Sequence, residues 1–155
     1  MKTKVLFIAA LLIGMAGFSQ KDEIREAEKA LKKGDAATAK TNIDAAAGMI
    51  SGADERLQAQ YYFVRGQVYG DLARKGDVAA FSTAVESYKK VLSSEEAVGK
   101  EKYSEEARIQ MSSIANDLVN AAVEDNKNKM FKEAAEKLYL ANHQGDQQVC
   151  GGTET

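Results

Sequence analysis

Apolar residues recur at three- and four-residue intervals along most of the chain, which is the spacing of one face of an amphipathic helix. The first such segment, residues 21–33, places Ile24, Ala27, Ala30 and Leu31 on one face. Segments 36–50, 57–75, 103–128 and 131–141 repeat the pattern. The spacing therefore predicts an all-α domain that covers residues 20–143.

Glycines and polar clusters interrupt this pattern where the chain is expected to turn. Gly34-Asp35 and Gly76-Asp77 each separate two predicted helices, and glycine readily adopts the left-handed conformation that ends a helix. The polar segment Ser93–Lys102 is expected to form a short helical turn or loop, with a break at Gly99. With the helix after Gly76-Asp77, which ends near Leu92, six helices are expected to fold as hairpins, with a further turn at 127–129.

The central hairpin carries two motifs, Tyr62-x2-Arg65-Gly66-x2-Tyr69 in its first helix and Ala84-x3-Tyr88 in its second. They match the halves of the tetratricopeptide (TPR) pattern, W-x2-L-G-x2-Y and A-x3-F. The hairpin therefore resembles a TPR repeat in which tyrosine replaces tryptophan and Arg65 replaces leucine. The resemblance implies that Gly66 is a close-packing position between the two helices.

The outer hairpins carry only the second half of the motif, as Ala39-x3-Ile43 and Ala134-x3-Leu138. The resemblance extends over residues 21–142 and implies about three degenerate helical hairpins, a TPR-like α-solenoid. Their spacing exceeds the usual TPR repeat of about 34 residues. In the last helix the inward set is expected to be Phe131, Ala134, Ala135, Leu138 and Ala141.

In TPR-like folds the first helices of successive hairpins line a concave groove, so the resemblance also implies a set of partner-binding residues. This set is Ile24, Glu28 and Lys32 in the first hairpin, Gln60, Phe63, Gln67 and Asp71 in the second, and Asn116, Val119, Val123 and Lys127 in the third. Its apolar floor and polar flanks suit an extended peptide or a helix, with Phe63 as the anchor. Two interpretations stay open, because the same residues could instead pack against a neighbouring repeat.

The N-terminal residues follow the plan of a secretory signal peptide rather than that of the helical domain. Lys2 and Lys4 precede an apolar run, Val5–Ile13, and small residues follow before Gln20. The run is shorter than the roughly 18–20 apolar residues of a membrane span. We expect cleavage before Gln20, removal of residues 1–19, and export to the periplasm or beyond. The ending Phe18-Ser19-Gln20 resembles signals common in Bacteroidetes.

Charge and chemistry narrow the function further. The chain has 21 basic and 23 acidic residues, a balance that does not suggest the basic face of a nucleic-acid-binding protein. A structural metal site normally needs four Cys or His ligands, whereas this chain has one His and one Cys. The acidic pairs Glu95-Glu96 and Glu105-Glu106 are expected on solvent-exposed faces. We therefore expect no catalytic residues, no metal and no cofactor.

Residues 144–155 contain glycines and few apolar residues, so we expect a disordered tail that includes Cys150. The sequence as a whole favours an exported TPR-like scaffold that binds a protein or peptide in its groove. The alternative is an N-terminal accessory domain, or a fragment, of a larger envelope protein or enzyme.

Overall fold

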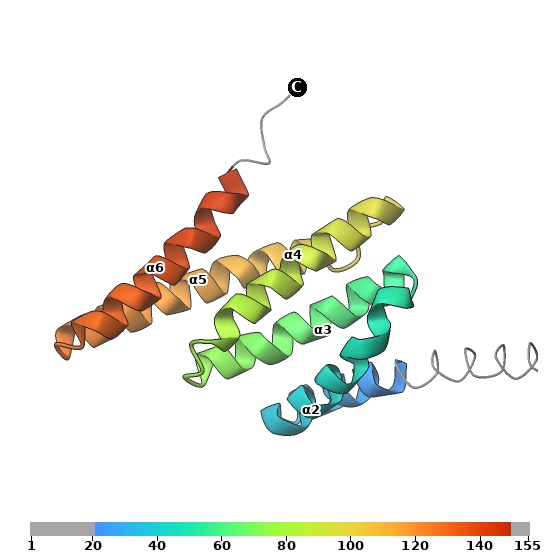
Figure 1. The fold of residues 1–155 in the computed structure, drawn as a ribbon, viewed down its shortest axis with the longest axis horizontal. Coiled ribbons are helices and arrows are strands. Elements are labelled where there is room, and N and C mark those ends of the chain that lie inside the picture. The colour runs from blue at the N-terminus through green and yellow to red at the C-terminus, as the bar shows by residue number, and fades with distance from the viewer. Residues whose placement is uncertain (1–20, 150–155) are drawn as a thin grey trace, which may run out of the picture.

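The computed structural model describes residues 21–149, and the side chains of residues 21–142, as a set of helices joined by short turns (Figure 1). Over this range the chain contains no strand, which confirms the all-α prediction. The elements are an N-terminal helix (residues 21–32), α2 (Ala36–Ala46), the 3-10 helix η1 (Ala47–Gly52), α3 (Glu55–Arg74), α4 (Ala80–Val98), α5 (Ser104–Lys127) and α6 (Phe131–Val149).

The helices lie side by side in chain order. The pair α3 and α4 forms the centre, α2 lies against α3, and α5 lies against α4 (Figure 1). The last helix, α6, packs along the C-terminal half of α5 and diverges from α4 (Figure 1). One buried cluster joins the N-terminal helix, α2 and α3, and a second joins α4, α5 and α6. The core is therefore a row of helix–helix interfaces.

A close helix–helix contact lies at Gly66, on the face of α3 that meets α4. A Cβ atom at this position would lie only 2.6 Å from Cε1 of the Tyr88 ring. The absence of a side chain thus lets Tyr88 pack directly on the α3 backbone. This confirms the predicted close-packing role of Gly66.

Two polar side chains link the neighbouring helices around this contact. Nη1 of Arg65 donates a hydrogen bond of 2.8 Å to Oγ of the buried Ser87 on α4. The hydroxyl of Tyr69 donates to Oδ1 of Asp44 on α2 at 2.8 Å. Arg65, which stands where the TPR pattern has leucine, therefore joins α3 to α4 by a hydrogen bond in addition to apolar packing.

Capping residues explain where the helices begin and end. Asp35 accepts a hydrogen bond from the backbone N–H of Thr38 at 3.0 Å, and Asp54 accepts one from Leu57 at 3.0 Å. Gly34, with φ of 76°, adopts the left-handed conformation in the turn before α2. An aspartate oxygen satisfies an N–H group that the first turn of a helix leaves without a partner. The predicted turn at Gly34-Asp35 is confirmed.

The connection between α4 and α5 differs from the prediction. Helix α4 continues through Ser93 to Val98, so the expected loop over Ser93–Lys102 is limited to the residues that follow Val98. Val91 and Glu95 are both buried and extend the inward face of α4 by another turn. The apolar pattern failed here because a buried acidic residue, Glu95, occupies an inward position.

The last helix differs in two respects. Helix α6 continues to Val149, past the predicted domain boundary at residue 143, and residues 150–155 of the expected tail lie outside the described residues. Ala134 and Ala141 are buried, but Phe131 is 62% exposed and Leu138 is 47% exposed. Ala135 is also exposed. The prediction that these three face inward was wrong, because α6 packs against α5 on one side only.

Candidate functional site

A groove with a volume of about 500 Å³ lies between the N-terminal helix, α3 and the beginning of α5. Each of these helices contributes side chains to its lining: Glu28, Leu31, Lys32, Phe63, Gln67, Asp71, Arg74, Tyr88, Tyr103 and Gln110. The lining combines aromatic rings, aliphatic chains and charged groups. This is the composition of a surface that contacts a peptide chain and its side chains.

The structure brings five of the sequence-predicted groove residues together here: Glu28, Lys32, Phe63, Gln67 and Asp71. They come from the N-terminal helix and from α3, which were predicted to be the first helices of the first two hairpins. A sixth predicted residue, Gln60, reaches the same surface, because its Nε2 donates a hydrogen bond of 3.0 Å to Oε1 of Glu28.

The other predicted residues lie elsewhere. Ile24 is fully buried in the cluster that joins the N-terminal helix, α2 and α3, so it does not line the groove. Asn116 lines a separate surface depression formed by α5 residues such as Arg108 and Ser112. Val119 and Val123 are 40% and 49% exposed and do not line the groove, and Lys127 pairs with Glu124 at 3.3 Å.

The prediction for α5 was wrong because the groove meets this helix near its start, at Gln110, and not at the predicted positions from Asn116 onwards. Nη2 of Arg74 donates to Oε1 of Gln110 and to Oγ of Ser113, each at 3.3 Å. Nε of Arg74 donates to Oδ2 of Asp117 at 2.9 Å, and Asn116, one residue or about 100° away around the helix, lies off this face.

Five residues that line the groove were not in the predicted set: Leu31, Arg74, Tyr88, Tyr103 and Gln110. The pattern on α3 could have indicated Arg74, because it follows Gln67 and Asp71 at helical spacing. Nothing in the sequence pairs Tyr103 or Gln110 with α3, since that pairing depends on the rotation of α5.

The floor of the groove is aromatic. The ring of Phe63 stacks on that of Tyr103, with centroids 4.7 Å apart, and meets the edge of the Tyr88 ring at 6.2 Å. Burial raises the pKa of the Tyr88 hydroxyl, so this side chain stays neutral at physiological pH. Phe63 is therefore a half-buried part of the floor, held between two other rings.

The position of Tyr103 is fixed by Glu95 of α4. The buried Glu95 carboxylate accepts hydrogen bonds from the backbone N–H groups of Lys102, Tyr103 and Ser104, each at 2.9 Å, and from the Ser104 hydroxyl at 2.7 Å. Burial raises the pKa of Glu95, but these hydrogen bonds outweigh it and hold the pKa below its ordinary value. The expectation that Glu95 lies on a solvent-exposed face was wrong, because its carboxylate turns inward and accepts the N–H groups at the start of α5.

Two further cavities adjoin the groove. At one end, a cavity of about 360 Å³ shares Tyr103 with the groove and lies beside the first turn of α3. At the other end, a cavity of about 650 Å³ shares Arg74 and Gln110 and lies between the α3–α4 turn and the hairpin of α5 and α6. We call these the α3-start cavity and the inter-hairpin cavity. With the groove between them, they form a run of depressions along α3.

A metal site and a membrane-spanning helix are two other features that would point to a function. Within the described part of the chain, no group of three or more His, Cys, Asp or Glu side chains is placed to hold a metal ion. Across residues 21–149, no helix is both long and apolar enough to cross a membrane. Comparisons with protein-family models, with curated proteins and with solved structures gave no match. The function must therefore be argued from the geometry of the groove.

Proposed function

We propose that this protein is an interaction scaffold that binds a peptide or a helix of a partner protein in the groove along α3. The observation that carries the proposal is the floor formed by Phe63, Tyr88 and Tyr103, surrounded by charged and amide side chains from three helices. Aromatic residues are enriched at protein interfaces, where they bury large areas at a low cost in conformational entropy.

The surroundings of this floor support a preformed site. Tyr103 is held by its backbone bond to Glu95, and Arg74 is held by Asp117, Gln110 and Ser113. Residues that are already fixed lose little freedom when a partner binds, so more of the contact energy appears as affinity. A scaffold with such a site binds without a large rearrangement of its own helices.

The TPR-like character and the export of the protein are parts of the same proposal. The motif around Gly66 supports the first, and the charged, apolar and small-residue pattern of residues 1–19 supports the second. Residues 1–19 lie outside the described residues, so this part rests on the sequence. The destination proposed is the periplasm or the cell exterior.

One surface favours the alternative of an accessory domain within a larger assembly. Several large hydrophobic side chains of the last hairpin are at least 40% exposed: Ile109, Val119, Val123, Met130, Phe131, Leu138 and Tyr139. They come from α5, from α6 and from the turn between them. Large exposed apolar side chains grouped on one hairpin are typical of a surface that another protein or domain covers.

Site-specific photocrosslinking in cells separates the two functions. A photoreactive residue at Gln67 reports contacts made in the groove, and one at Leu138 reports contacts made on the last hairpin. The scaffold proposal expects a discrete crosslinked partner from Gln67. Capture from Leu138 alone would instead favour the accessory domain and would reject the groove as the binding site.

A substitution in the groove wall tests whether such a crosslink depends on the groove. Gln67 is half-buried on the groove wall, so Gln67→Arg places a long charged side chain across the floor without opening the core. We expect it to abolish capture from a photoreactive residue placed at Lys32. Ser112→Arg, on the exposed side of α5, is the matched control and should leave capture unchanged.

A further inference from the structure

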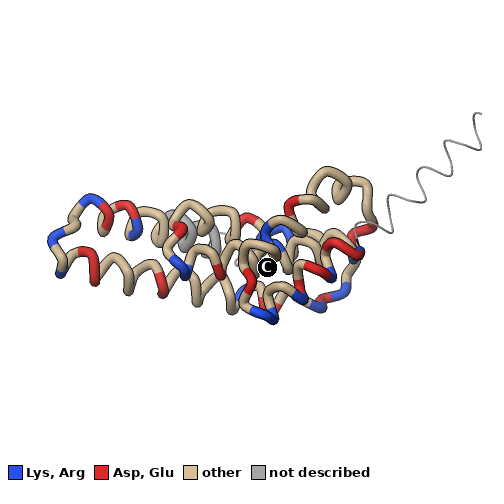
Figure 2. The backbone as a smooth tube through the Cα atoms, turned by 90° about the horizontal axis from the view of Figure 1, so that it is seen from below, with Lys and Arg blue, Asp and Glu red and all other residues tan. Residues whose placement is uncertain are grey.

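The charges along the groove and its two adjoining cavities are not evenly distributed. The α3-start cavity is lined by four basic residues and two acidic ones: Lys21, Arg56, Lys100, Lys102, Asp54 and Glu95. Basic residues therefore outnumber acidic ones at this end. Figure 2 shows basic and acidic residues interleaved along the backbone as a whole, so the excess is local.

Both acidic residues of the α3-start cavity already accept hydrogen bonds from backbone N–H groups of the fold. Asp54 accepts a hydrogen bond from the backbone N–H of Leu57 and caps α3. Glu95 is only 3% exposed, and its oxygens accept the N–H groups at the start of α5. Their negative charge is directed to helix N-termini, which are themselves partly positive. The four cations outnumber these two carboxylates, and the further acidic group that acts on Lys102 is Glu28, which lines the adjoining groove.

Farther along, Glu28 and Lys32 of the groove lining carry opposite charges, and the other charged residues are paired. Asp71 pairs with Lys75 at 2.7 Å, and Arg74 pairs with Asp117 at 2.9 Å. In the inter-hairpin cavity, Lys137 pairs with Asp125, and both of these side chains are mostly buried. The unbalanced charge is therefore confined to the end of the groove beside the first turn of α3.

The opposite end has an apolar floor. Phe81, Ile114 and Leu118 are buried residues that line the inter-hairpin cavity. Ala73, Val78 and Ala121 add further aliphatic surface to the same cavity. A partner side chain that enters this cavity meets a surface suited to an aliphatic or aromatic group, with the polar groups of Arg74 and Gln110 at the junction with the groove.

We propose that the partner segment is an extended peptide that places Asp or Glu side chains in the α3-start cavity and apolar side chains in the inter-hairpin cavity. This inference rests on the proposed function and specifies the chemistry and the orientation of its ligand. Charge complementarity favours acidic side chains next to Arg56 and Lys100, and like charges there would repel a basic segment. The other end disfavours the reverse placement, because its floor is apolar and its cations, Arg74 and Lys137, already pair with Asp117 and Asp125.

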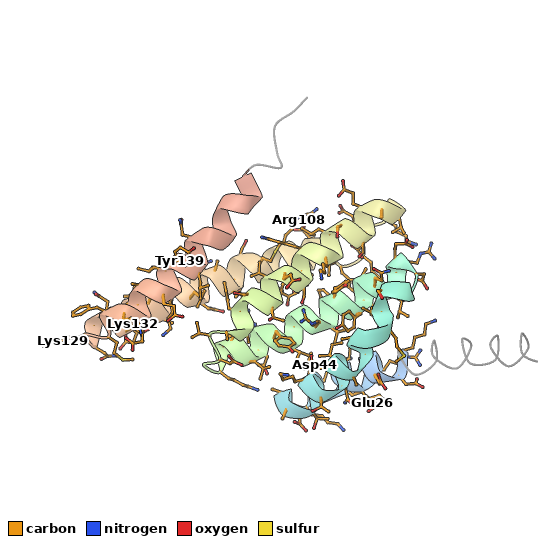
Figure 3. All side chains as sticks on the ribbon, viewed as in Figure 1. Glu26, Asp44, Arg108, Lys129, Lys132 and Tyr139 are labelled. Atoms are coloured by element: carbon orange, nitrogen blue, oxygen red, sulfur yellow. The ribbon has the colours of Figure 1, made fainter. Side chains whose placement is uncertain are left out.

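A random-sequence peptide library displayed on phage provides the probe. It is selected against the immobilised protein and, in parallel, against the double variant Arg56→Gln, Lys100→Gln. Both residues are exposed, so the variant should fold normally. The control is Lys127→Gln, Lys132→Gln, which removes the same charge at the far end of the molecule, where Figure 3 shows Lys132.

We expect the selected peptides to contain clustered Asp or Glu at one end and apolar residues at the other. Their affinity, measured by fluorescence anisotropy with synthetic copies, should fall roughly threefold or more for the Arg56→Gln, Lys100→Gln variant. It should be unchanged for the control. Raising the salt concentration should weaken binding to the original protein more than to the variant, because exposed charges are screened.

The remaining outcomes separate the two proposals. Peptides that bind through the groove, as shown by loss with Gln67→Arg, but lack acidic residues or tolerate the loss of Arg56 and Lys100, would overturn this inference and leave the proposed function standing. Preferential selection of basic peptides would also overturn it. Failure to select any peptide that depends on Gln67 would overturn both.

Discussion

Glu95 near the end of α4 caps the first turn of α5 through Ser104, whose hydroxyl and backbone N–H both donate to Glu95 Oε2, at 2.7 Å and 2.9 Å. A capping residue is usually the one that directly precedes its own helix. Here the cap comes from the preceding helix, and it joins α4 to α5 at the groove.

Replacing Glu95 should therefore destabilise the protein, because its carboxylate accepts the hydrogen bonds at the start of α5. Glu95→Gln keeps the shape of the side chain but removes the charge, and one of its acceptor oxygens becomes a donor that faces backbone N–H groups. We expect a loss of about 1.5–3 kcal/mol in the free energy of unfolding, the range for hydrogen bonds to charged groups. Urea denaturation measures it, with the exposed neighbour in Glu96→Gln as a control that should change by less than about 0.5 kcal/mol.

The same carboxylate predicts how stability depends on pH. The folded pKa of Glu95 lies below its ordinary value of 4.5, so at low pH the unfolded chain takes up a proton before the folded one does. The stabilisation is present above pH 4.5 and is lost as pH falls through the lower folded pKa. Unfolding curves of the original protein and of Glu95→Gln should converge on acidification over this window. A stability difference that stays constant to the lowest pH would contradict the assigned ionisation.

Gly66 and Gly34 predict two different costs for the same substitution. Gly66→Leu must displace the Tyr88 ring, which lies 2.6 Å from the position of a Cβ atom, and overpacking of this kind costs about 1–3 kcal/mol or more. Gly34 has nothing within 4 Å but has φ of 76°, so Gly34→Leu costs about 1 kcal/mol through the backbone alone. Thermal melts should rank Gly66→Leu as the less stable variant. The opposite order would remove Gly66 from the interface between α3 and α4.

The periodic pattern predicted the helices well because each inward stripe is built from residues that are apolar and buried. Ala39, Val64, Val68 and Ile114 are examples, each at most 1% exposed. It failed at Glu95, where a buried carboxylate stabilises a helix start that lies several residues later in the chain. No local pattern reveals that its partners are the N–H groups of residues 102–104.

The groove was predicted only in part, because it also depends on contacts between helices that are distant in the sequence. The set mapped from the TPR resemblance contains Glu28 and Gln67, which line the groove, but also Ile24, which is buried. The rotation of α5 depends on contacts with α3, such as Arg74 with Asp117, that no local spacing encodes. The predicted set on α5 therefore began at Asn116, whereas the groove meets this helix at Gln110.

The exposure of the apolar stripe on α6 leads to a prediction about its role. Phe131→Ser and Leu138→Ser should each change the free energy of unfolding by less than about 1 kcal/mol, because their side chains are already 62% and 47% exposed. Ile114→Ala, at a fully buried site, should cost about 2–5 kcal/mol. Chemical denaturation of the three variants checks this. A large loss for Phe131→Ser would show that a part of the chain covers this face.

The Phe63–Tyr103 stack allows folding and binding effects to be separated. Because Phe63 is half-buried between Tyr103 and Tyr88, Phe63→Ala should lower stability as well as weaken binding of the selected peptides, so that variant alone cannot identify an anchor. A double-mutant cycle with Tyr103→Ala resolves the pair. Stacked aromatic rings contribute about 0.5–1.5 kcal/mol beyond their buried area, and the cycle should return a coupling energy in this range for unfolding.

The same cycle, measured on peptide affinity instead of stability, tests the groove floor. If a bound peptide lies across both rings, removing either ring should lower the affinity, and removing both should lower it by less than the sum of the two effects. Neighbouring residues that share one partner show this non-additivity. Ser112→Ala, at an exposed position outside the groove, supplies a control that should leave the affinity unchanged. Affinities that are unchanged in Phe63→Ala and in Tyr103→Ala, in proteins shown to be folded, would reject the aromatic floor as the binding surface.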